Sequence, residues 1–296
     1  MSEQTPHFEL DRHAIRAHFE RAAGTYDGAA VLQAEVARRL LERLDIVKLS
    51  PCRVLDLGAG TGLATADLLV RYPKATVIAL DLALGMLRQA GRRGRWRRRA
   101  SLVAADAVAM PFSNAAFDLI CSSLMLQWCQ PPDAVLRELA RVVAPEGLVM
   151  FATLGPDTLR ELRDSWARVD DRQHVGMFVD MHDIGDAMLR AGFKDPVVDV
   201  ETITLTYESV PGLLRDLKAL GATNAASGRA SGLGGRGALA GMIRAYETHR
   251  REDGLLPATY EVIYGHAWAG EVRSSRASFP GETHIPVSQL LGRSRR

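Results

Sequence analysis

The stretch that decides the fold is VLDLGAGTG, residues 54–62. A short apolar run ends here in glycines at every second position, and a helical pattern follows over residues 63–72. Glycine lets the backbone turn tightly and lets a ligand approach without a Cβ in the way. The helix after the glycines presents unpaired N–H groups at its first turn. We therefore expect a strand, a ligand-binding loop and a helix.

Outward from this loop, short apolar runs alternate with helical patterns. The runs interpreted as strands cover residues 52–57, 75–81, 101–105, 117–123, 148–154, 196–207 and 258–268. Further helical patterns cover residues 83–90, 132–143 and 181–191. This alternation predicts βαβ units and a parallel sheet. The fold class is therefore α/β, with a seven-stranded, mostly parallel, Rossmann-like sheet.

The segments around the sheet predict four parts. Residues 1–48 form an N-terminal helical lid, with a break at residues 24–28 between two helices. The α/β core covers residues 49–207 and 257–268. Residues 208–256 form a helical insertion between the last two strands, with helices over 211–220 and 239–250, and the polar tail 269–296 is loosely held.

Composition excludes several classes of protein. The formal net charge is only +2 over 296 residues, so bulk charge does not indicate a nucleic-acid partner. The N-terminus is polar and no run of 18 apolar residues occurs, which predicts neither a secretory signal nor a membrane span. Three cysteines without a CxxC pair fit a reducing compartment and a cytoplasmic protein with no metal site.

Acidic residues at the ends of successive strands indicate the ligand. Asp56 precedes a GxGxG loop, and a carboxylate there suits a cationic ligand better than a pyrophosphate. Asp81 ends the second strand, where it can accept both hydroxyls of a ribose, and Asp106 follows the third, where it can accept from an adenine amine. S-adenosylmethionine (SAM) fits this set. A dinucleotide oxidoreductase and a turn without a ligand remain open alternatives.

The expected SAM-binding residues lie on or after the first four strands. They are Asp56, Gly58, Ala59, Gly60, Gly62, Asp81, Leu82, Met86, Asp106, Ala107 and Ser122.

These motifs also resemble a known family. VLDLGAGTG (54–62), ALD (79–81), ADA (105–107) and FDLICSSLMLQW (117–128) resemble the class I methyltransferases. The flanking motifs resemble the malonyl-[acyl-carrier protein] O-methyltransferases of biotin synthesis: FERAAGTYD (19–27), GPDTL (155–159), DMHDIGD (180–186), DLKALGATN (216–224) and PATYEVIYGHAW (257–268). The resemblance covers residues 8 to 268, and it implies an enzyme.

The resemblance implies a reaction. The enzyme would transfer a methyl group from SAM to the free carboxylate of malonyl-acyl carrier protein, or of malonyl-CoA, to make the primer for pimelate and biotin synthesis. Acyl carrier protein would then be the partner. A methyltransferase acting on a quinone precursor or a small dicarboxylic acid, and a respiratory-complex assembly factor of the same fold, are the alternatives.

The chemistry of carboxylate methylation limits the expected active site. A carboxyl group with a pKa of about 4 is already ionised at neutral pH, so no catalytic His, Cys or metal is expected. Donors that hold an anion are needed, including at least one cation. We predict Tyr26, Gln127 and Ser123 as catalytic residues. The predicted substrate-binding residues are Tyr26, Gln33, Trp128, Arg215 and Lys218.

Two further features stay outside this assignment. Residues 92–99 (RRGRWRRR) carry six arginines, which predict either a solvated loop or a docking patch for an acidic carrier protein. His266 shares one face of the last predicted strand with Tyr260, Tyr264 and Trp268, so we interpret it as a packed residue rather than a base.

Overall fold

The computed structural model of the chain describes residues 10–93, 99–222 and 236–270. Within them the predicted sheet is confirmed, with strand order β3-β2-β1-β4-β5-β7-β6. β7 runs antiparallel to both neighbours, and the other pairings are parallel. The strands are β1 (Arg53–Leu57), β2 (Thr76–Asp81), β3 (Ser101–Ala104), β4 (Phe117–Ser123), β5 (Val143–Leu154), β6 (Lys194–Tyr207) and β7 (Leu256–Trp268).

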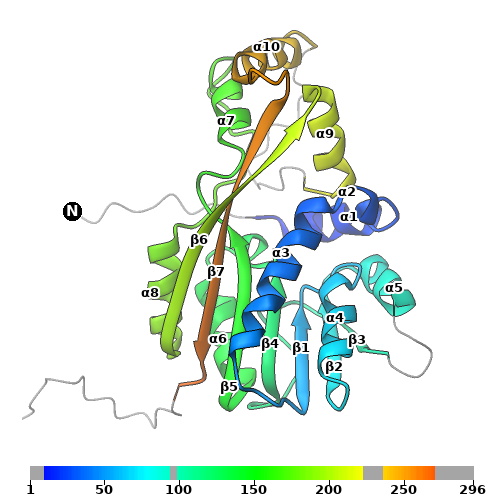
Figure 1. Cartoon of the computed structure of the whole chain (residues 1–296), viewed down its shortest axis with the longest axis vertical. Coiled ribbons are helices and arrows are strands. Elements are labelled where there is room, and N and C mark those ends of the chain that lie inside the picture. Colours follow the sequence, from blue (N-terminus) through cyan, green and yellow to red (C-terminus); the bar gives the residue numbers. More distant parts are fainter. Residues whose placement is uncertain (1–9, 94–98, 223–235, 271–296) are drawn as a thin grey trace, which may run out of the picture.

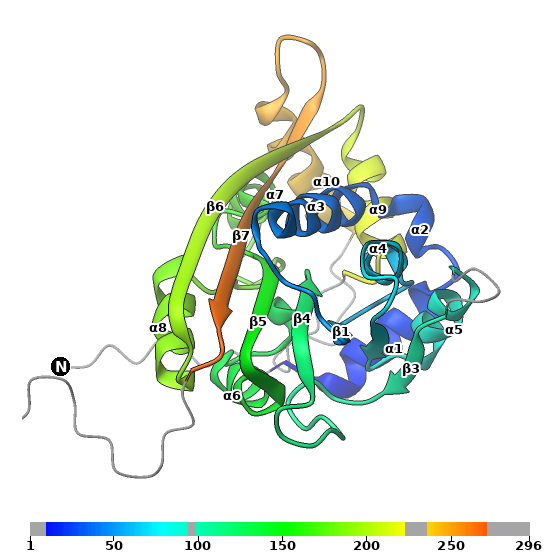
Figure 2. The same cartoon turned by 60° about the horizontal axis from the view of Figure 1, so that its bottom comes forward.

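Helices cover both faces of the sheet, as Figures 1 and 2 show. Successive strand residues point to opposite faces, so Val54 joins one buried cluster and Leu55 the other. α3 (Val31–Glu42) and α4 (Leu63–Arg71) contribute to the first cluster. α6 (Asp133–Val142) and α8 (Met181–Ala191) contribute to the second. α5 (Leu84–Arg93) follows β2, and α6 and α8 lie where the sequence predicted helices.

The N-terminal segment contains one helix more than predicted. α1 (Arg12–Ala22) and α3 are joined by a short helix, α2 (Tyr26–Ala29), inside the expected break at residues 24–28. The local sequence with its two glycines predicts a turn, but Tyr26 packs against a small buried cluster that includes Ala22 and Met86. This tertiary contact holds the turn in a helical conformation. A 3₁₀ turn, Arg43–Ile46, follows α3.

β6 and β7 extend past the other strands and carry the helices at one end of the molecule (Figure 1). α9 (Val210–Ala219), α10 (Arg236–Tyr246) and the 3₁₀ turn Glu247–His249 lie between these two strands in the chain. α7 (Arg160–Ala167) contacts α10 and β7 and is a helix that the sequence pattern missed. Its buried side mixes Leu162 with Glu161 and Ser165, so polar residues interrupt its apolar side.

The fifth strand begins earlier than predicted, at Val143 instead of Leu148, because Val143 pairs with Phe117 ahead of an irregularity in the register. Within the described residues, no helix combines the length and apolarity needed to cross a membrane. The arginines at positions 95, 97 and 98 and the tail from residue 271 lie outside the described residues.

Candidate functional site

A cavity lies at the carboxyl ends of β1, β2 and β4 and beside the turn after β3, and we call it the rim cavity. Gly60, Asp81 and Asp106 line it together, as the sequence analysis required. Seven other predicted residues join them: Gly58, Leu82, Met86, Ala107, Ser123, Tyr26 and Trp128. The cavity lies where open α/β sheets bind ligands, because the carboxyl ends of parallel strands meet at one edge.

The glycine loop and Asp81 form one hydrogen-bonded unit. Gly58, Gly60 and Gly62 all have positive φ, of 72°, 55° and 84°, a region that glycine adopts without strain. One carboxylate oxygen of Asp81 accepts from the Gly60 N–H at 2.8 Å, and the other accepts from the Ala83 N–H at 2.8 Å. A carboxylate has about four acceptor positions, so Asp81 keeps capacity for ligand hydroxyls.

Asp56 and Ser122 lie beneath the cavity rather than in its lining. The Asp56 carboxyl group is buried and accepts a hydrogen bond from the Thr65 hydroxyl, and burial raises its pKa to about 7. The Ser122 hydroxyl donates to the Leu57 carbonyl at 2.9 Å and so ties β4 to β1. Both residues support the loop from below. Ala59 and Gly62 are likewise outside the lining that the described residues form.

A residue that the sequence analysis missed closes the cavity beside β3. Arg12, at the start of α1, donates to an Asp106 carboxylate oxygen at 2.7 Å. Arg12 and Asp106 both line the rim cavity, so α1 covers the position where the sequence predicts the adenine. Arg12 lies in no sequence motif that could have identified it.

A second set of contacts fixes α2 to the glycine loop, and we call it the Asp27 latch. Asp27 accepts from the Thr61 hydroxyl at 2.6 Å and is ion-paired with Arg93 of α5. Arg93 also donates from Nε to the Thr61 carbonyl at 2.7 Å. Because Tyr26 directly precedes Asp27, the latch holds Tyr26 at the cavity. Arg93 belongs to the arginine run, so at least this arginine is not simply solvated.

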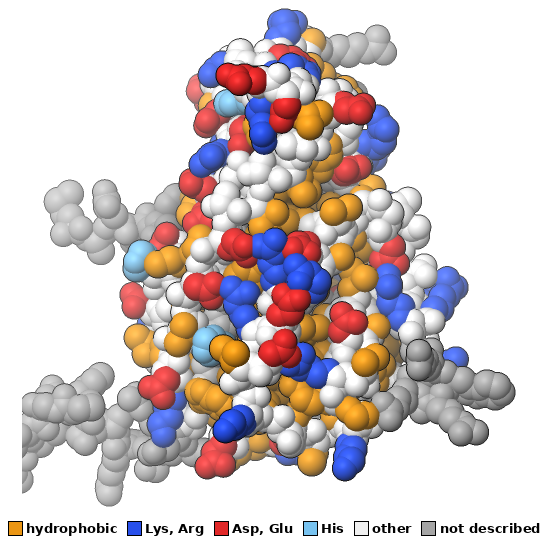
Figure 3. Space-filling model, in the orientation of Figure 1, with side chains coloured by type: hydrophobic (Ala, Val, Ile, Leu, Met, Phe, Trp, Pro, Cys, Tyr) orange, Lys and Arg blue, Asp and Glu red, His pale blue; other side chains and the backbone are white. Residues whose placement is uncertain are grey.

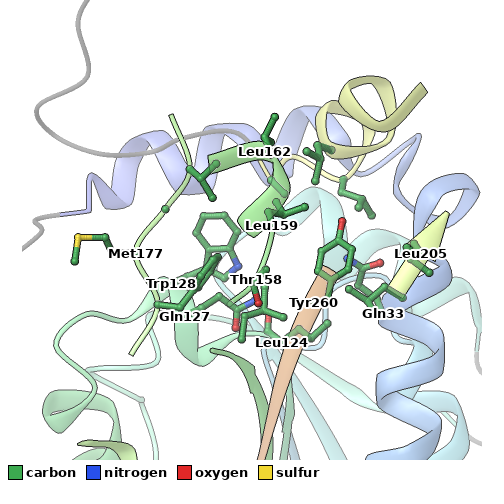
Figure 4. A pocket seen from close by; sticks show the side chains of 18 of the residues that line it. Gln33, Leu124, Gln127, Trp128, Thr158, Leu159, Leu162, Met177, Leu205 and Tyr260 are labelled. Carbon is green, nitrogen blue, oxygen red and sulfur yellow. The ribbon is translucent and has the colours of Figure 1, made fainter. Parts of the chain in front are cut away.

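A second, larger cavity adjoins the first, and we call it the acceptor cavity. Figure 4 shows Gln33 of α3 and Tyr260 of β7 on one side of it and Gln127 and Trp128 on the other. Tyr26 also lines it, so four of the seven side chains predicted for catalysis or substrate binding meet here. Much of the remaining lining is apolar, including Leu124, Leu159, Leu162, Leu205, Leu217 and Leu220.

The two cavities share part of their walls. Phe19, Tyr26, Leu124 and Trp128 line both. The rings of Phe19 and Trp128 meet edge to face with their centroids 5.2 Å apart, which joins α1 to the segment after β4. A group leaving one cavity would therefore enter the other between these four side chains.

The polar side chains of the acceptor cavity differ in their hydrogen bonding. The Gln127 amide donates to the Leu124 carbonyl at 2.7 Å and accepts from Thr153 at 3.2 Å, so its orientation is fixed. Gln33 Oε1 is buried without a hydrogen-bond partner. Burial, together with Asp81 and Asp27, raises the pKa of Tyr26 above its ordinary value, so its phenol stays protonated and can donate.

Two predicted substrate-binding residues do not reach this cavity. Arg215 and Lys218 lie on the exposed face of α9, whereas Leu217 of α9 and Leu220, directly after it, line the cavity. The lining formed by the described residues contains no lysine or arginine, so the cation expected there is missing. The cavity instead offers neutral donors in an apolar setting.

The sequence analysis also missed residues of the acceptor cavity whose positions depend on distant contacts. His174 lines it while its Nε2 hydrogen-bonds to Asp170 at 2.8 Å and its ring stacks on Trp166. Leu124 and Leu159 line it with positive φ, of 53° and 55°, which is a strained region for leucine. His266 lies on β7 outside both cavities, and burial lowers its pKa.

The geometry defines the class of protein. A sheet of order β3-β2-β1-β4-β5-β7-β6 with one antiparallel strand carries a glycine loop and two strand-end aspartates around one cavity. This is the architecture of a class I methyltransferase. A family model described as a methyltransferase domain matches residues 55–151. The phosphoethanolamine N-methyltransferase 2 of Haemonchus contortus, solved with S-adenosyl-L-methionine, shares the fold with a TM-score of 0.55 and 15% identity, covering 87% of this chain and 60% of that one.

Curated relatives identify the family. The malonyl-[acyl-carrier protein] O-methyltransferase of Halorhodospira halophila is 52% identical over 97% of this chain and 97% of its own length. The protein of the same name from Laribacter hongkongensis is 51% identical over 92% of this chain and 94% of its own. The chain belongs to the malonyl-[acyl-carrier protein] O-methyltransferase family. The resemblance drawn from the motifs is thereby confirmed, as is the prediction of a methyltransferase.

Proposed function

We propose that the protein transfers a methyl group from SAM to the free carboxylate of malonyl-acyl carrier protein, yielding the methyl ester that primes pimelate synthesis for biotin. The observation that carries the proposal is the pair of cavities joined at Phe19, Tyr26, Leu124 and Trp128. One cavity has the acids and glycines that suit SAM. The other has an apolar lining with neutral donors, which suits an acyl chain that ends in a carboxylate.

The rim cavity fits SAM by the chemistry of its donors and acceptors. Asp81 would accept from the ribose hydroxyls and Asp106 from the adenine amine, while Gly60 leaves open space, because an added Cβ there would meet no atom within 4 Å. When bound, SAM supplies an activated methyl group on a positively charged sulfur. The chain's own residues then have to bind and orient the acceptor and exclude water from it.

The acceptor needs no proton removed. A carboxyl group is ionised at neutral pH, so a general base would contribute nothing to its attack. The protein's contribution is alignment of the carboxylate, for which orientation alone can supply on the order of 7–11 kcal/mol. The apolar lining keeps water from the carboxylate oxygens. Because the described lining has no lysine or arginine, the sulfonium is the permanent counter-charge. The charges of both groups disappear together as the methyl group moves.

Specific donors can hold the carboxylate. Tyr26 lines both cavities and keeps its proton, so its hydroxyl can donate to an oxygen of the acceptor. Trp128 can donate only through its indole N–H. Gln33 Oε1 is buried with no hydrogen-bond partner among the described residues. Turning the amide over would place its N–H₂ group at that position, where it could donate to a bound carboxylate. Ser123 lines the rim cavity close to this junction.

The test is transfer of labelled methyl from SAM to malonyl-acyl carrier protein, run beside malonyl-CoA, a quinone precursor and free malonate. We expect the carrier-bound thioester to be methylated most efficiently. Tyr26→Phe should lower kcat about 10- to 100-fold, because it removes one hydrogen bond to an ion, worth about 1.5–3 kcal/mol. SAM binding with no transfer to either malonyl thioester would overturn the proposal.

A further inference from the structure

α1 and α9 meet beside the acceptor cavity. The Thr25 hydroxyl, just after α1, donates to the Ala219 carbonyl of α9 at 3.0 Å. Gly221 packs so closely on α1 that an added Cβ would lie 3.1 Å from the His18 carbonyl. The inner faces of both helices line the cavity, through Phe19 from α1 and Leu217 from α9. Their outer faces therefore form the surface directly over the place where the acyl group would enter.

Positive charge on these outer faces is not balanced. Arg21 of α1 and Arg215 and Lys218 of α9 are exposed, and none has an ion pair in the part of the chain that the structure describes. The acids of the same helices are already engaged. Glu20 accepts from the Gly85 N–H at 2.8 Å, and Asp216 is hydrogen-bonded to Tyr207. We call Arg21, Arg215 and Lys218 the α1–α9 basic surface.

The charged side chains over α3 and β6, in contrast, are paired with one another. Over α3 and β6, Figure 3 shows acidic and basic side chains interleaved. Arg39 pairs with Glu35 and Glu201, and Arg43 pairs with Asp199. These charges neutralise one another within the chain, so that face offers little attraction to a charged partner. Among the described residues, the α1–α9 basic surface has no such internal partners.

We propose that the α1–α9 basic surface is the docking site of the carrier protein, and that it binds an acidic helix surface of that carrier. The inference rests on the proposed function, because a thioester carried on a long arm requires the body of its carrier to sit outside the cavity. Charge complementarity steers the two proteins together, and the arm then passes over Leu217 into the acceptor cavity. Arg215 and Lys218 thus act on the carrier and not on the malonyl group.

The test compares two malonyl thioesters. Arg21→Glu should raise KM for malonyl-acyl carrier protein about tenfold and leave kcat/KM for malonyl-pantetheine, which lacks the carrier, unchanged. Lys218→Glu should produce a similar rise in KM for the carrier-bound substrate. The native KM for that substrate should increase with salt, and the salt dependence should weaken in both variants. Lys74→Glu is the matched control, since Lys74 is exposed at the opposite edge of the sheet, before β2.

The outcomes separate the two proposals. If the native protein methylates neither thioester, the proposed function fails. If it methylates both, but Arg21→Glu and Lys218→Glu use the carrier-bound substrate as well as Lys74→Glu does, the docking site is wrong. An equal loss on malonyl-pantetheine and on the carrier-bound substrate would also overturn it, because a docking residue acts only on the carrier.

Discussion

Arg93→Gln should weaken SAM binding by opening the Asp27 latch. Arg93 pairs with Asp27 and donates to the Thr61 carbonyl at 2.7 Å. The ion pair is half-exposed, with side-chain exposures of 30% and 51%, so we assign it only about 0.2–1 kcal/mol. The bond from the guanidinium to the carbonyl adds about 1.5 kcal/mol. We call the state with the Asp27 latch formed the closed state. Destabilising it by about 2 kcal/mol shifts the equilibrium between closed and open states roughly 30-fold.

The assay is isothermal calorimetry with SAM, combined with stopped-flow measurement of SAM release. We expect Kd to rise about 10- to 30-fold, mainly through faster release, because α2 covers the bound ligand in the closed state. Arg92→Gln is the matched control, since Arg92 is the neighbouring arginine and bonds only to Gln89 of its own helix among the described residues. The urea midpoints of both variants should stay close to the native value.

A double-mutant cycle decides whether the latch is the cause. Asp27→Asn should weaken SAM binding to a similar degree, and the Arg93→Gln, Asp27→Asn pair should be little worse than either single change. Strict additivity of the two effects, or a Kd in Arg93→Gln equal to that of Arg92→Gln, would refute the reasoning.

Two other predictions concern the loop and the residue below it. The pKa of Asp56 is about 7 against an ordinary 3.8, so the unfolded chain ionises first and the free energy of unfolding falls as pH rises between these values. Asp56→Asn should flatten this dependence and raise the urea midpoint at pH 8, and a pH dependence as steep as the native one would contradict the raised pKa. In Gly58→Ala the new Cβ would lie 2.3 Å from the Met125 side chain at a φ of 72°, costing about 1–3 kcal/mol of stability. Gly28→Ala, which meets nothing within 4 Å, is its control in the same denaturation experiment, and equal midpoints would contradict the strain.

Local patterns predicted most of the sheet because β1, β2, β4, β5 and β7 are largely buried on both faces. Residues 77–80 (VIAL), for example, are apolar throughout, as is typical of a strand in a parallel sheet that is covered on both faces. Two helices, α7 and α2, were not predicted because tertiary contacts stabilise them. α7 buries Glu161, which accepts hydrogen bonds from Thr259, so a charged residue interrupts the apolar side of this short helix. α2 forms because Tyr26 finds a buried cluster made from distant residues.

The sequence likewise predicted some residues of the candidate site and not others. Gly60, Asp81 and Asp106 were predictable, because each ends a strand and parallel strands end at one edge. The sequence predicted a cation in the acceptor cavity, and the described lining has no lysine or arginine. Packing decides which side of α9 faces the cavity: Leu217 faces it, and Lys218 faces solvent. Spacing along the chain could not distinguish the two.

The sequence by itself determined the glycine loop, the order of strands and helices, and the family. These depend on backbone preferences and burial patterns that neighbouring residues carry. Only the tertiary structure decided that Arg12 reaches Asp106, that Asp27 joins Thr61 to Arg93, and that the two cavities share a wall. These contacts join residues 34 to 94 positions apart. Their free energy is gained only after the chain has folded, so no local pattern records them.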